Sequence, residues 1–280
     1  MSALVYVNGD LVPKLSARLS VYDHGLLYGD GVWEGMRLRN GDIPYLDLHL
    51  THLDAAVKAM ALPLSLSRDE LAAVIRSAIA ANARQSGYVR VVMTRGPGTI
   101  GLDPRKCDPC IIVLVDDVVP FPAELYAHGL HVITSGIRFD PSNPLHRIRS
   151  LSHGHMTLAK AEALRAGCLD AILLTPSDLV AGTCEGHLFR VKEHAIQMAN
   201  AGLPADVAAN LVHEIAVRQG VPWESASLTI ADLQETDEVF LAGTTGGVIG
   251  IVRLDGRDLG SGTEGPVTRA IRTAYREMLS

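Results

Sequence analysis

Apolar positions in the first 120 residues group into short β-rich runs separated by stretches of helical spacing. Residues 5–13 predict two strands joined by a turn at residues 8–10, and three further segments predict strands at residues 36–39, 88–94 and 110–115. Apolar residues recur every three or four positions from Leu50 to Met60 and again from Leu71 to Ile79, which predicts two helices. The second helix begins at a capping box formed by Ser67 and Glu70. Strands with two helices packed on them predict an α+β N-terminal domain over residues 1–120.

After the segment Pro120-Phe121-Pro122, predicted strands and helices alternate along the chain. The strands are predicted at residues 130–134, 171–174, 188–191, 238–241 and 248–252, and the helices at 156–166, 207–218 and 266–278. Pro266 suits the first turn of a helix, and Gly167 and Gly220 stand where helices end. This alternation predicts a larger α/β C-terminal domain over residues 121–280.

The composition narrows the function classes. The chain has 280 residues, 48% of them apolar, and a net charge of −6. These values exclude disordered, collagen-like and coiled-coil proteins, and the acidic balance argues against a protein that neutralises nucleic-acid phosphates. The opening residues lack the apolar core of a signal peptide, and no apolar run is long enough to span a membrane. We therefore expect a cytoplasmic protein with a small-molecule substrate.

The four cysteines do not form a disulfide framework in a chain of this length. Cys107 and Cys110 have the spacing of redox and zinc motifs, but a predicted strand follows them where a redox motif would open a helix. Cys168 and Cys184 do not supply a second zinc pair. We therefore expect no metal site.

A turn rich in glycine and threonine follows the predicted strand at residues 238–241. Gly243, Thr244 and Thr245 offer hydroxyl groups and unhindered backbone N–H groups at the end of that strand. Such a turn is suited to binding a phosphate or an oxyanion, and a simple tight turn is the alternative.

Residues 28–37, which read Tyr-Gly-Asp-Gly-Val-Trp-Glu-Gly-Met-Arg, resemble the N-terminal signature of the class IV aminotransferases. These are the fold-type IV pyridoxal-phosphate enzymes, which include branched-chain and D-amino-acid aminotransferases and aminodeoxychorismate lyase. Further landmarks follow in family order at His49-Leu50, Leu158–Ala163, Asp237–Phe240, Leu254–Gly256 and Gly265–Thr268. The resemblance spans the chain and implies fold-type IV architecture, a homodimer and an enzyme.

The resemblance also implies where the cofactor would be held, and this sequence departs from the family there. The position of the Schiff-base lysine corresponds to Arg149, eleven residues before Lys160. An arginine stays protonated, so it cannot form an internal aldimine. The glutamate that pairs with the pyridine nitrogen corresponds to Ala181 or Gly182, and Glu185 takes that role only if the alignment is shifted.

The phosphate contacts implied by the resemblance are changed as well. The phosphate-binding arginine corresponds to His52, and the phosphate-binding turn corresponds to residues 202–205, where Pro204 has no N–H group. Only Gly243, Thr244 and Thr245 remain as a former phosphate seat. We therefore expect that the protein binds no pyridoxal phosphate.

Histidines stand at or beside the changed positions, namely His52, His153, His155 and His187. Histidine transfers protons near neutral pH, so we predict that His153 or His155 acts as a general acid or base. Arg149 is predicted to bind a carboxylate or phosphate of the substrate, because its planar guanidinium fits such groups. His52 and His187 are predicted to line the substrate site; polar fillers of a vacated pocket are the alternative.

The residues that would meet the substrate are better preserved than those that would meet the cofactor. Tyr28 and Trp33 belong to the first signature and are predicted to bind the substrate. Arg90 and Arg95 lie on one predicted strand with an odd spacing, so at most one of them faces the pocket. Arg95 is favoured, because Gly96 ends the strand beside it, and a solvent-facing arginine is the alternative.

Three functions are consistent with these residues. The first is a class IV aminotransferase-like enzyme that works without pyridoxal phosphate, as a lyase, hydrolase or isomerase of a small carboxylate- or amine-bearing substrate. The second is a pyridoxal-phosphate-dependent aminotransferase of branched-chain or D-amino-acid type with an unconventional site. The third is a homologue that binds a ligand without turnover.

Overall fold

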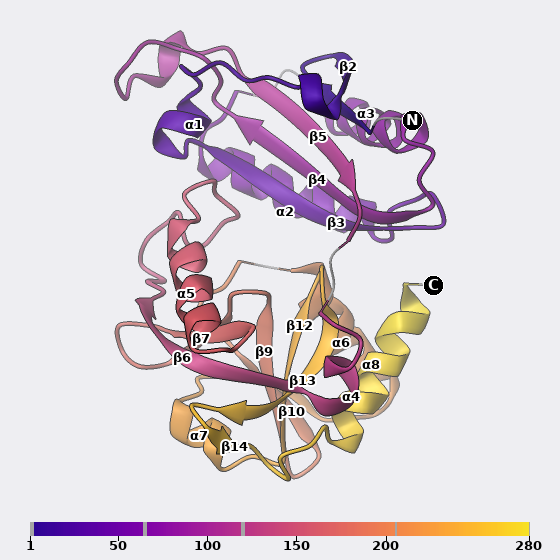
Figure 1. The fold of residues 1–280 in the computed structure, drawn as a ribbon, viewed down its shortest axis with the longest axis vertical. Coiled ribbons are helices and arrows are strands. Elements are labelled where there is room, and N and C mark those ends of the chain that lie inside the picture. Colours follow the sequence, from indigo (N-terminus) through magenta and orange to yellow (C-terminus); the bar gives the residue numbers. More distant parts are fainter. Residues whose placement is uncertain (1–2, 64–65, 119–120, 205, 280) are drawn as a thin grey trace. The chain divides into compact units, whose positions relative to one another are not determined.

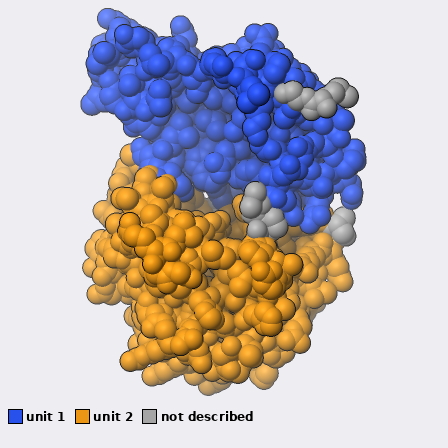
Figure 2. Space-filling model, viewed as in Figure 1, with its two compact units in different colours: residues 1–118, 148–153 blue, residues 119–147, 154–280 orange. Residues whose placement is uncertain are grey.

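The computed structural model describes residues 3–63, 66–118, 121–204 and 206–279. The chain divides into two compact units, shown in different colours in Figure 2: unit 1 comprises residues 1–118 and 148–153, and unit 2 comprises residues 119–147 and 154–280. Pro120, where the sequence suggested a boundary, lies outside the described residues. Residues 148–153 fall in the second predicted domain by sequence, but their contacts place them in unit 1.

Unit 1 is a five-stranded sheet in the order β2-β1-β5-β4-β3, with helices α2 and α3 on one face (Figure 1). Its strands are β1 (Leu4–Val7), β2 (Asp10–Pro13), β3 (Gly31–Arg39), β4 (Ser86–Thr94) and β5 (Cys110–Asp116). Its helices are η1 (Lys14–Ser16), α1 (His24–Tyr28), α2 (Leu46–Ala59), α3 (Arg68–Ala81) and η2 (Pro104–Lys106). The predicted capping box of Ser67 and Glu70 is confirmed at the start of α3.

Side chains alternate between two faces along β3 and β4. Val32, Met36 and Leu38 point to the helices and join the main hydrophobic core of unit 1. The opposite face carries Trp33 and, on β4, Arg90. The sequence analysis placed the strand only at residues 36–39, because glycines interrupt the pattern before that point. These glycines allow close approach: a Cβ atom at residue 35 would lie 1.9 Å from the Tyr88 hydroxyl oxygen.

The edge of β3 is extended by a short segment from much later in the chain. Ser150 forms an antiparallel bridge with Val32, and the Trp33 N–H donates to the carbonyl of Arg149 over 2.9 Å. The Leu151 N–H donates to the carbonyl of Gly31, also over 2.9 Å. The backbone on both sides of residue 149 is therefore fixed to the sheet of unit 1.

Unit 2 is a nine-stranded sheet in the order β11-β10-β9-β12-β13-β6-β7-β8, with β14 paired to β13. The strands are β6 (Leu130–Arg138), β7 (Asp170–Leu174), β8 (Val180–Thr183), β9 (His187–Lys192), β10 (Ala195–Ala199), β11 (Trp223–Ala226), β12 (Glu238–Gly243), β13 (Gly247–Leu254) and β14 (Arg257–Asp258). The helices are α4 (Leu125–His128), α5 (Gly154–Arg165), α6 (Val207–Arg218), α7 (Ile230–Gln234) and α8 (Pro266–Met278). Helix α5 packs on β6 and β7, while α6 and α8 pack on β12 (Figure 1).

Unit 2 mixes parallel and antiparallel strands, and its main core gathers apolar residues of the central strands with partly buried residues from α4 and α7. The predicted strands and helices of this half are all present, and β8, β10, β11 and β14 were not predicted because each is only two to five residues long. None of the helices in the described residues is long and apolar enough to cross a membrane.

Candidate functional site

In unit 1, four residues predicted or considered as functional meet at one indole ring. The Arg90 guanidinium lies over the Trp33 ring, with Cζ 4.4 Å from the ring centroid, and Cζ of Arg149 lies 5.7 Å from the same centroid. The imidazole of His153 contacts the ring edge-on, with centroids 5.5 Å apart. We refer to Trp33, Arg90, Arg149 and His153 as the Trp33 site. Trp33 is half-buried and Arg90 is exposed, so the site is accessible on the Arg90 side within this unit.

The sheet explains why these residues meet. Arg90 lies opposite Gly35 in the β3–β4 register, so no side chain at position 35 separates its guanidinium from Trp33. One Arg90 nitrogen, Nη2, also donates to the Tyr88 hydroxyl over 3.3 Å. Arg149 reaches the ring from the other side of β3, because its own backbone is paired with Trp33 at the edge of the sheet.

Arg149 is bound to a buried carboxylate. Its Nη1 lies 3.2 Å from Oε2 of Glu34, and the other Glu34 oxygen lies 2.7 Å from Nδ1 of His49 on α2. The side chains of Glu34 and His49 are only 2% and 4% exposed. Neither residue was assigned a role from the sequence, although both belong to the motifs quoted there. Glu34 lies in the glycine-rich stretch before the predicted strand at residues 36–39, and His49 lies directly before the first residue of the predicted helix from Leu50 to Met60.

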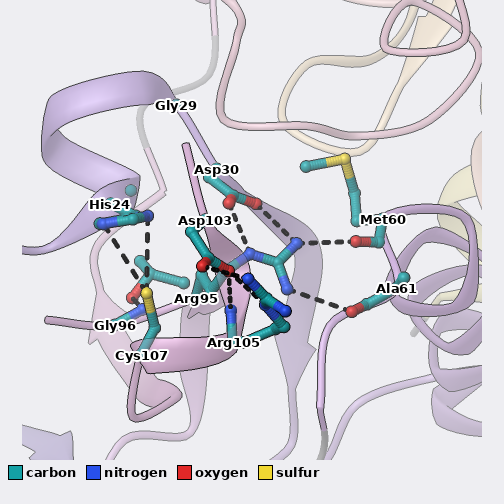
Figure 3. A network of polar contacts seen from close by, with 12 residues as sticks. His24, Gly29, Asp30, Met60, Ala61, Arg95, Gly96, Asp103, Arg105 and Cys107 are labelled. Carbon is teal, nitrogen blue, oxygen red and sulfur yellow. Dashed lines mark hydrogen bonds and ion pairs between the residues drawn. The ribbon is translucent and has the colours of Figure 1, made fainter. Parts of the chain in front are cut away.

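Arg95 is placed differently from the sequence-based expectation that it would bind substrate. Its guanidinium donates to both carboxylate oxygens of Asp30 and to the carbonyls of Met60 and Ala61 at the end of α2 (Figure 3). These four bonds occupy four of its five N–H donors, and the residue is 7% exposed. Arg95 therefore ties β4 to α2, and Arg90 is the arginine that lies on the open face of the strand.

Tyr28 lies at the end of α1. Its hydroxyl accepts a hydrogen bond from the Gly101 N–H over 2.9 Å, and its ring packs edge-on against His24. The His24 ring in turn contacts the thiol of Cys107, with 3.6 Å between Sγ and Nδ1 (Figure 3). Burial raises the pKa of the Cys107 thiol, as it does for Cys110, whose pKa rises to about 11. Both remain thiols near neutral pH.

The other predicted histidines lie in separate places. His52 is half-exposed on α2, one turn after His49. His155, at the start of α5 in unit 2, stacks on His146 with ring centroids 4.1 Å apart, and both rings contact Phe139. Nδ1 of His146 accepts a hydrogen bond from the Asp140 N–H over 3.0 Å, which fixes this ring.

In unit 2, the predicted phosphate seat is the turn between β12 and β13. Gly243 and Gly247 are paired at its base, with Thr244 and Thr245 at its half-exposed tip. Its Gly246 carbonyl accepts a hydrogen bond from the Tyr126 hydroxyl over 2.6 Å. The adjoining turn after β8 packs closely on it, because a Cβ atom at Gly243 would lie 2.1 Å from the carbonyl oxygen of Glu185.

The segment after β10 fills the space beside β8. A Cβ atom at Gly182 would lie 2.1 Å from Cδ1 of Leu203, and the backbone at Gly182 has a φ of +150°, so a side chain there would clash with Leu203. His187 is buried, and its Nε2 lies 3.0 Å from the carbonyl oxygen of Pro204. Ala205, the last residue of the turn implied by the resemblance, lies outside the described residues.

A buried carboxylate and an ion pair lie near these turns. Asp170 is completely buried at the start of β7, and its Oδ1 accepts hydrogen bonds from the N–H groups of Ala171 and Cys184. Burial raises the pKa of Asp170 to about 6, and burial together with the Asp170 charge raises the pKa of the Cys184 thiol. Lys160 forms an ion pair with Glu185, with 2.6 Å between Nζ and Oε1.

These residues do not fit a pyridoxal phosphate held by a Schiff base. The position that the resemblance implies for the lysine has a guanidinium, which cannot form an imine. The position implied for the pyridine partner is Ala181, with an apolar side chain, or Gly182, where Leu203 occupies the adjacent space. Glu185, which corresponds to the pyridine partner only if the alignment is shifted, forms an ion pair with Lys160. Among the described residues at the positions implied for the cofactor, the 243–247 turn offers groups suited to a phosphate. No group of three potential metal ligands is present among the described residues.

Comparison with known proteins places the chain in a family. The family model for amino-transferase class IV matches residues 31–254. A protein of Methanocaldococcus jannaschii, named provisionally as a branched-chain-amino-acid aminotransferase, is 32% identical over 281 residues, covering 98% of this chain and 96% of the relative. The relative and the family model together cover both units.

Solved structures give the same result for the fold. The branched-chain aminotransferase of the thermophilic archaeon Thermoproteus uzoniensis, solved with norvaline, is 25% identical, with a TM-score of 0.92 over 100% of this chain and 95% of that one. The 4-amino-4-deoxychorismate lyase of Pseudomonas aeruginosa is 26% identical, with a TM-score of 0.82 over 98% of both chains. The predicted fold is therefore confirmed, and the chain belongs to the class IV aminotransferase family.

Proposed function

We propose that this protein is an enzyme on the class IV aminotransferase scaffold that acts on a small carboxylate-bearing substrate without pyridoxal phosphate. The observation that carries this proposal is the Trp33 site, where two guanidinium groups and one imidazole meet at one ring. Guanidinium groups bind carboxylates through paired N–H donors, and an imidazole beside them can move a proton. Lyase, hydrolase and isomerase reactions all use such a proton transfer.

Within this proposal each residue has a distinct task. Arg90 and Arg149 bind and orient a carboxylate group of the substrate, and Arg90 takes the role that the sequence analysis gave to Arg95. His153 accepts a proton from the atom next to that carboxylate and returns it later in the reaction. The two guanidinium groups stabilise the negative charge that develops when the proton leaves. His155, the other histidine predicted for proton transfer, lies in unit 2 and stacks on His146.

The independence from pyridoxal phosphate rests on Arg149. We propose that Arg149 stands where the family has its Schiff-base lysine and that Glu34 keeps it there as a structural ion pair. Each missing charge-assisted contact weakens cofactor binding by about 1.5–3 kcal/mol, so several together lower the affinity by orders of magnitude.

We predict that the purified protein stays colourless after addition of pyridoxal phosphate. Borohydride reduction followed by mass spectrometry should find no adduct on any of the five lysines.

The Arg149→Lys variant should lose most activity toward a substrate found by screening, because an ammonium group cannot bind a carboxylate through two parallel N–H donors as a guanidinium does. It should gain no transaminase activity. A yellow Arg149→Lys protein that transaminates an amino acid readily would instead support the pyridoxal-phosphate-dependent alternative.

We further propose that the protein is a homodimer that pairs through an apolar patch of unit 1. The patch consists of Val21, Tyr22, Leu26, Ile100 and Leu102, which are between 51% and 81% exposed. The two segments that contain these residues, 21–28 and 98–102, are joined by hydrogen bonds from the Gly98 N–H to the Tyr22 carbonyl and from the Gly101 N–H to the Tyr28 hydroxyl. Large apolar side chains gathered in this way are typical of an interface.

We expect light scattering to show a dimer at micromolar concentration, with an interface of about 2,000 Å² or more. The double variant Leu26→Asp/Leu102→Asp should be monomeric, because two charges would be buried without partners in the interface. The matched control Leu158→Asp/Val217→Asp changes two leucine- or valine-sized exposed residues of unit 2 and should remain dimeric. A monomeric wild-type protein would rule the dimer out.

A further inference from the structure

Arg149 is one end of a chain of three charged or titratable groups inside unit 1. The Glu34 carboxylate lies between His49, 2.7 Å away, and Arg149, 3.2 Å away, and uses a different oxygen for each. Glu34 and His49 are almost completely buried, whereas 13% of the Arg149 side chain is accessible. A buried carboxylate with two such partners has its position fixed by both of them.

The direction of the hydrogen bonds defines what each group does. The carboxylate can only accept, so Nδ1 of His49 carries the proton and donates it to Oε1 of Glu34. His49 lies in the first turn of α2, which is packed on the sheet through Leu46, Leu50 and Leu53. The helix therefore holds His49, His49 holds Glu34, and Glu34 holds the guanidinium that lies beside Trp33.

The same carboxylate also sets the charge at the Trp33 site. Its negative charge cancels the positive charge of Arg149, whereas Arg90 forms no ion pair among the described residues and contacts only the Tyr88 hydroxyl and two aromatic rings. Arg37 lies on the same face of β3, two residues beyond Gly35, and is opposite Tyr88 in the register. The charges of Glu34, Arg149 and Arg90 therefore sum to one positive charge.

We propose that Glu34 and His49 are positioning residues for Arg149, and that Glu34 limits the Trp33 site to ligands with one carboxylate rather than two. This inference rests on the proposed function, because it takes the Trp33 site as the place where substrate binds. The two guanidinium carbons are within about 10 Å of each other, since both lie close to one ring centroid. Without Glu34 they would therefore form a doubly charged site that favours dianions.

The experiment measures binding of two probes of similar length, propionate with one carboxylate and succinate with two. The chain has only two tryptophans, so in a Trp223→Phe background the emission reports on Trp33 alone. Each probe is titrated at fixed ionic strength, and the ratio of the two affinities is the readout. A variant that displaces Arg149 should lower the affinities for propionate and succinate by the same factor. A variant that changes the charge of the site should change the ratio of the two affinities, because the electrostatic attraction scales with the charge of the ligand.

We expect the wild-type site to bind propionate at least as tightly as succinate. Glu34→Gln keeps the shape of the side chain and removes its charge, so it should shift the affinity ratio toward succinate by about tenfold. His49→Leu should weaken both probes without changing the ratio, because Glu34 keeps its charge but loses its donor. His49→Asn restores an N–H donor near the Nδ1 position and should recover most of the loss.

If Glu34→Gln alone does not fold, the double variant Glu34→Gln/Arg149→Gln replaces the whole ion pair by neutral groups of similar shape. The net charge at the ring is then unchanged, and the affinity ratio should match the wild-type ratio. A Glu34→Gln ratio within about twofold of wild type, or a double variant that strongly favours succinate, would overturn the inference while leaving the proposed site intact. If neither probe binds the wild-type protein, the Trp33 site itself is wrong and the inference fails with it.

Discussion

Replacing Arg95 with methionine is expected to lower the free energy of unfolding of unit 1 by about 3–5 kcal/mol, the range for removing one partner of a buried ion pair. The Arg95 side chain is 8% exposed and that of Asp30 is 22% exposed, so the remaining carboxylate would be only partly hydrated. The carbonyls of Met60 and Ala61 would lose their donors as well. Chemical denaturation followed by circular dichroism measures the change.

Arg105→Met is the matched control for this prediction. Arg105 forms the same kind of forked contact with Asp103, but its side chain is 83% exposed. Exposed ion pairs contribute little to stability, so this variant should be close to wild type. Arg95→Lys keeps the charge but not the planar fork, and its loss should fall between the two. Equal stabilities of the Arg95→Met and Arg105→Met variants would show that the network in Figure 3 does not hold unit 1 together.

The second large effect concerns the ionisation of Asp170. Burial raises its pKa in the folded protein from 3.8 to about 6. A raised pKa means that the folded state binds the proton more tightly, so the stability that this group contributes is present below about pH 4 and is lost as the pH rises through about 6. At neutral pH the ionised carboxylate therefore costs up to about 3 kcal/mol, because each pKa unit corresponds to about 1.4 kcal/mol.

Asp170→Asn should remove this cost, since the amide oxygen can still accept the hydrogen bonds from Ala171 and Cys184. We expect the variant to be more stable than wild type at pH 8 by up to about 3 kcal/mol and to lose this advantage as the pH falls to about 4. Thermal unfolding across this pH range measures the difference. An advantage that does not change with pH would mean that Asp170 is not the group responsible.

Asp103 is a useful comparison with Asp170, because its pKa is lowered rather than raised. Hydrogen bonds from Arg105 lower the pKa of Asp103 to about 2. Its contribution to stability is therefore present at neutral pH and is lost as the pH falls through about 2. Because this ion pair is exposed, Asp103→Asn should be close to wild type at neutral pH, and the sign of any pH dependence should be opposite to that of Asp170→Asn.

The long amphipathic elements could be predicted from sequence because their local pattern and their packing agree. The helix from Arg68 to Ala81 begins at a capping box that is complete in the structure, and its apolar face enters the core of unit 1. The strand from Gly31 to Arg39 was predicted only in part. Its glycines weaken the strand pattern, and they are present because the neighbouring backbone and the Tyr88 side chain come too close for a Cβ atom.

The choice between Arg90 and Arg95 shows the limit of strand periodicity. The alternation along β4 correctly indicates that the two side chains point to opposite faces. It does not indicate which face is covered by α2 and α3, and this decides that Arg95 meets the end of α2 while Arg90 lies over Trp33. The roles of the predicted histidines stay predictions, because the spacing of histidines along the chain does not determine which groups each imidazole contacts in the folded protein.

By itself, the sequence determined the family and the fold type, because these follow from the order of the motifs, and it predicts that Arg149 stands at the position of the Schiff-base lysine. Only the tertiary structure decided that residues 148–153 pair with the edge of β3 and that Glu34 and His49, on a strand and a helix, meet there. The contact between Arg149 and Glu34 joins residues 115 positions apart along the chain. Such pairs cannot be predicted from local sequence patterns, because they depend on the register of the sheet and on the packing of α2 on it.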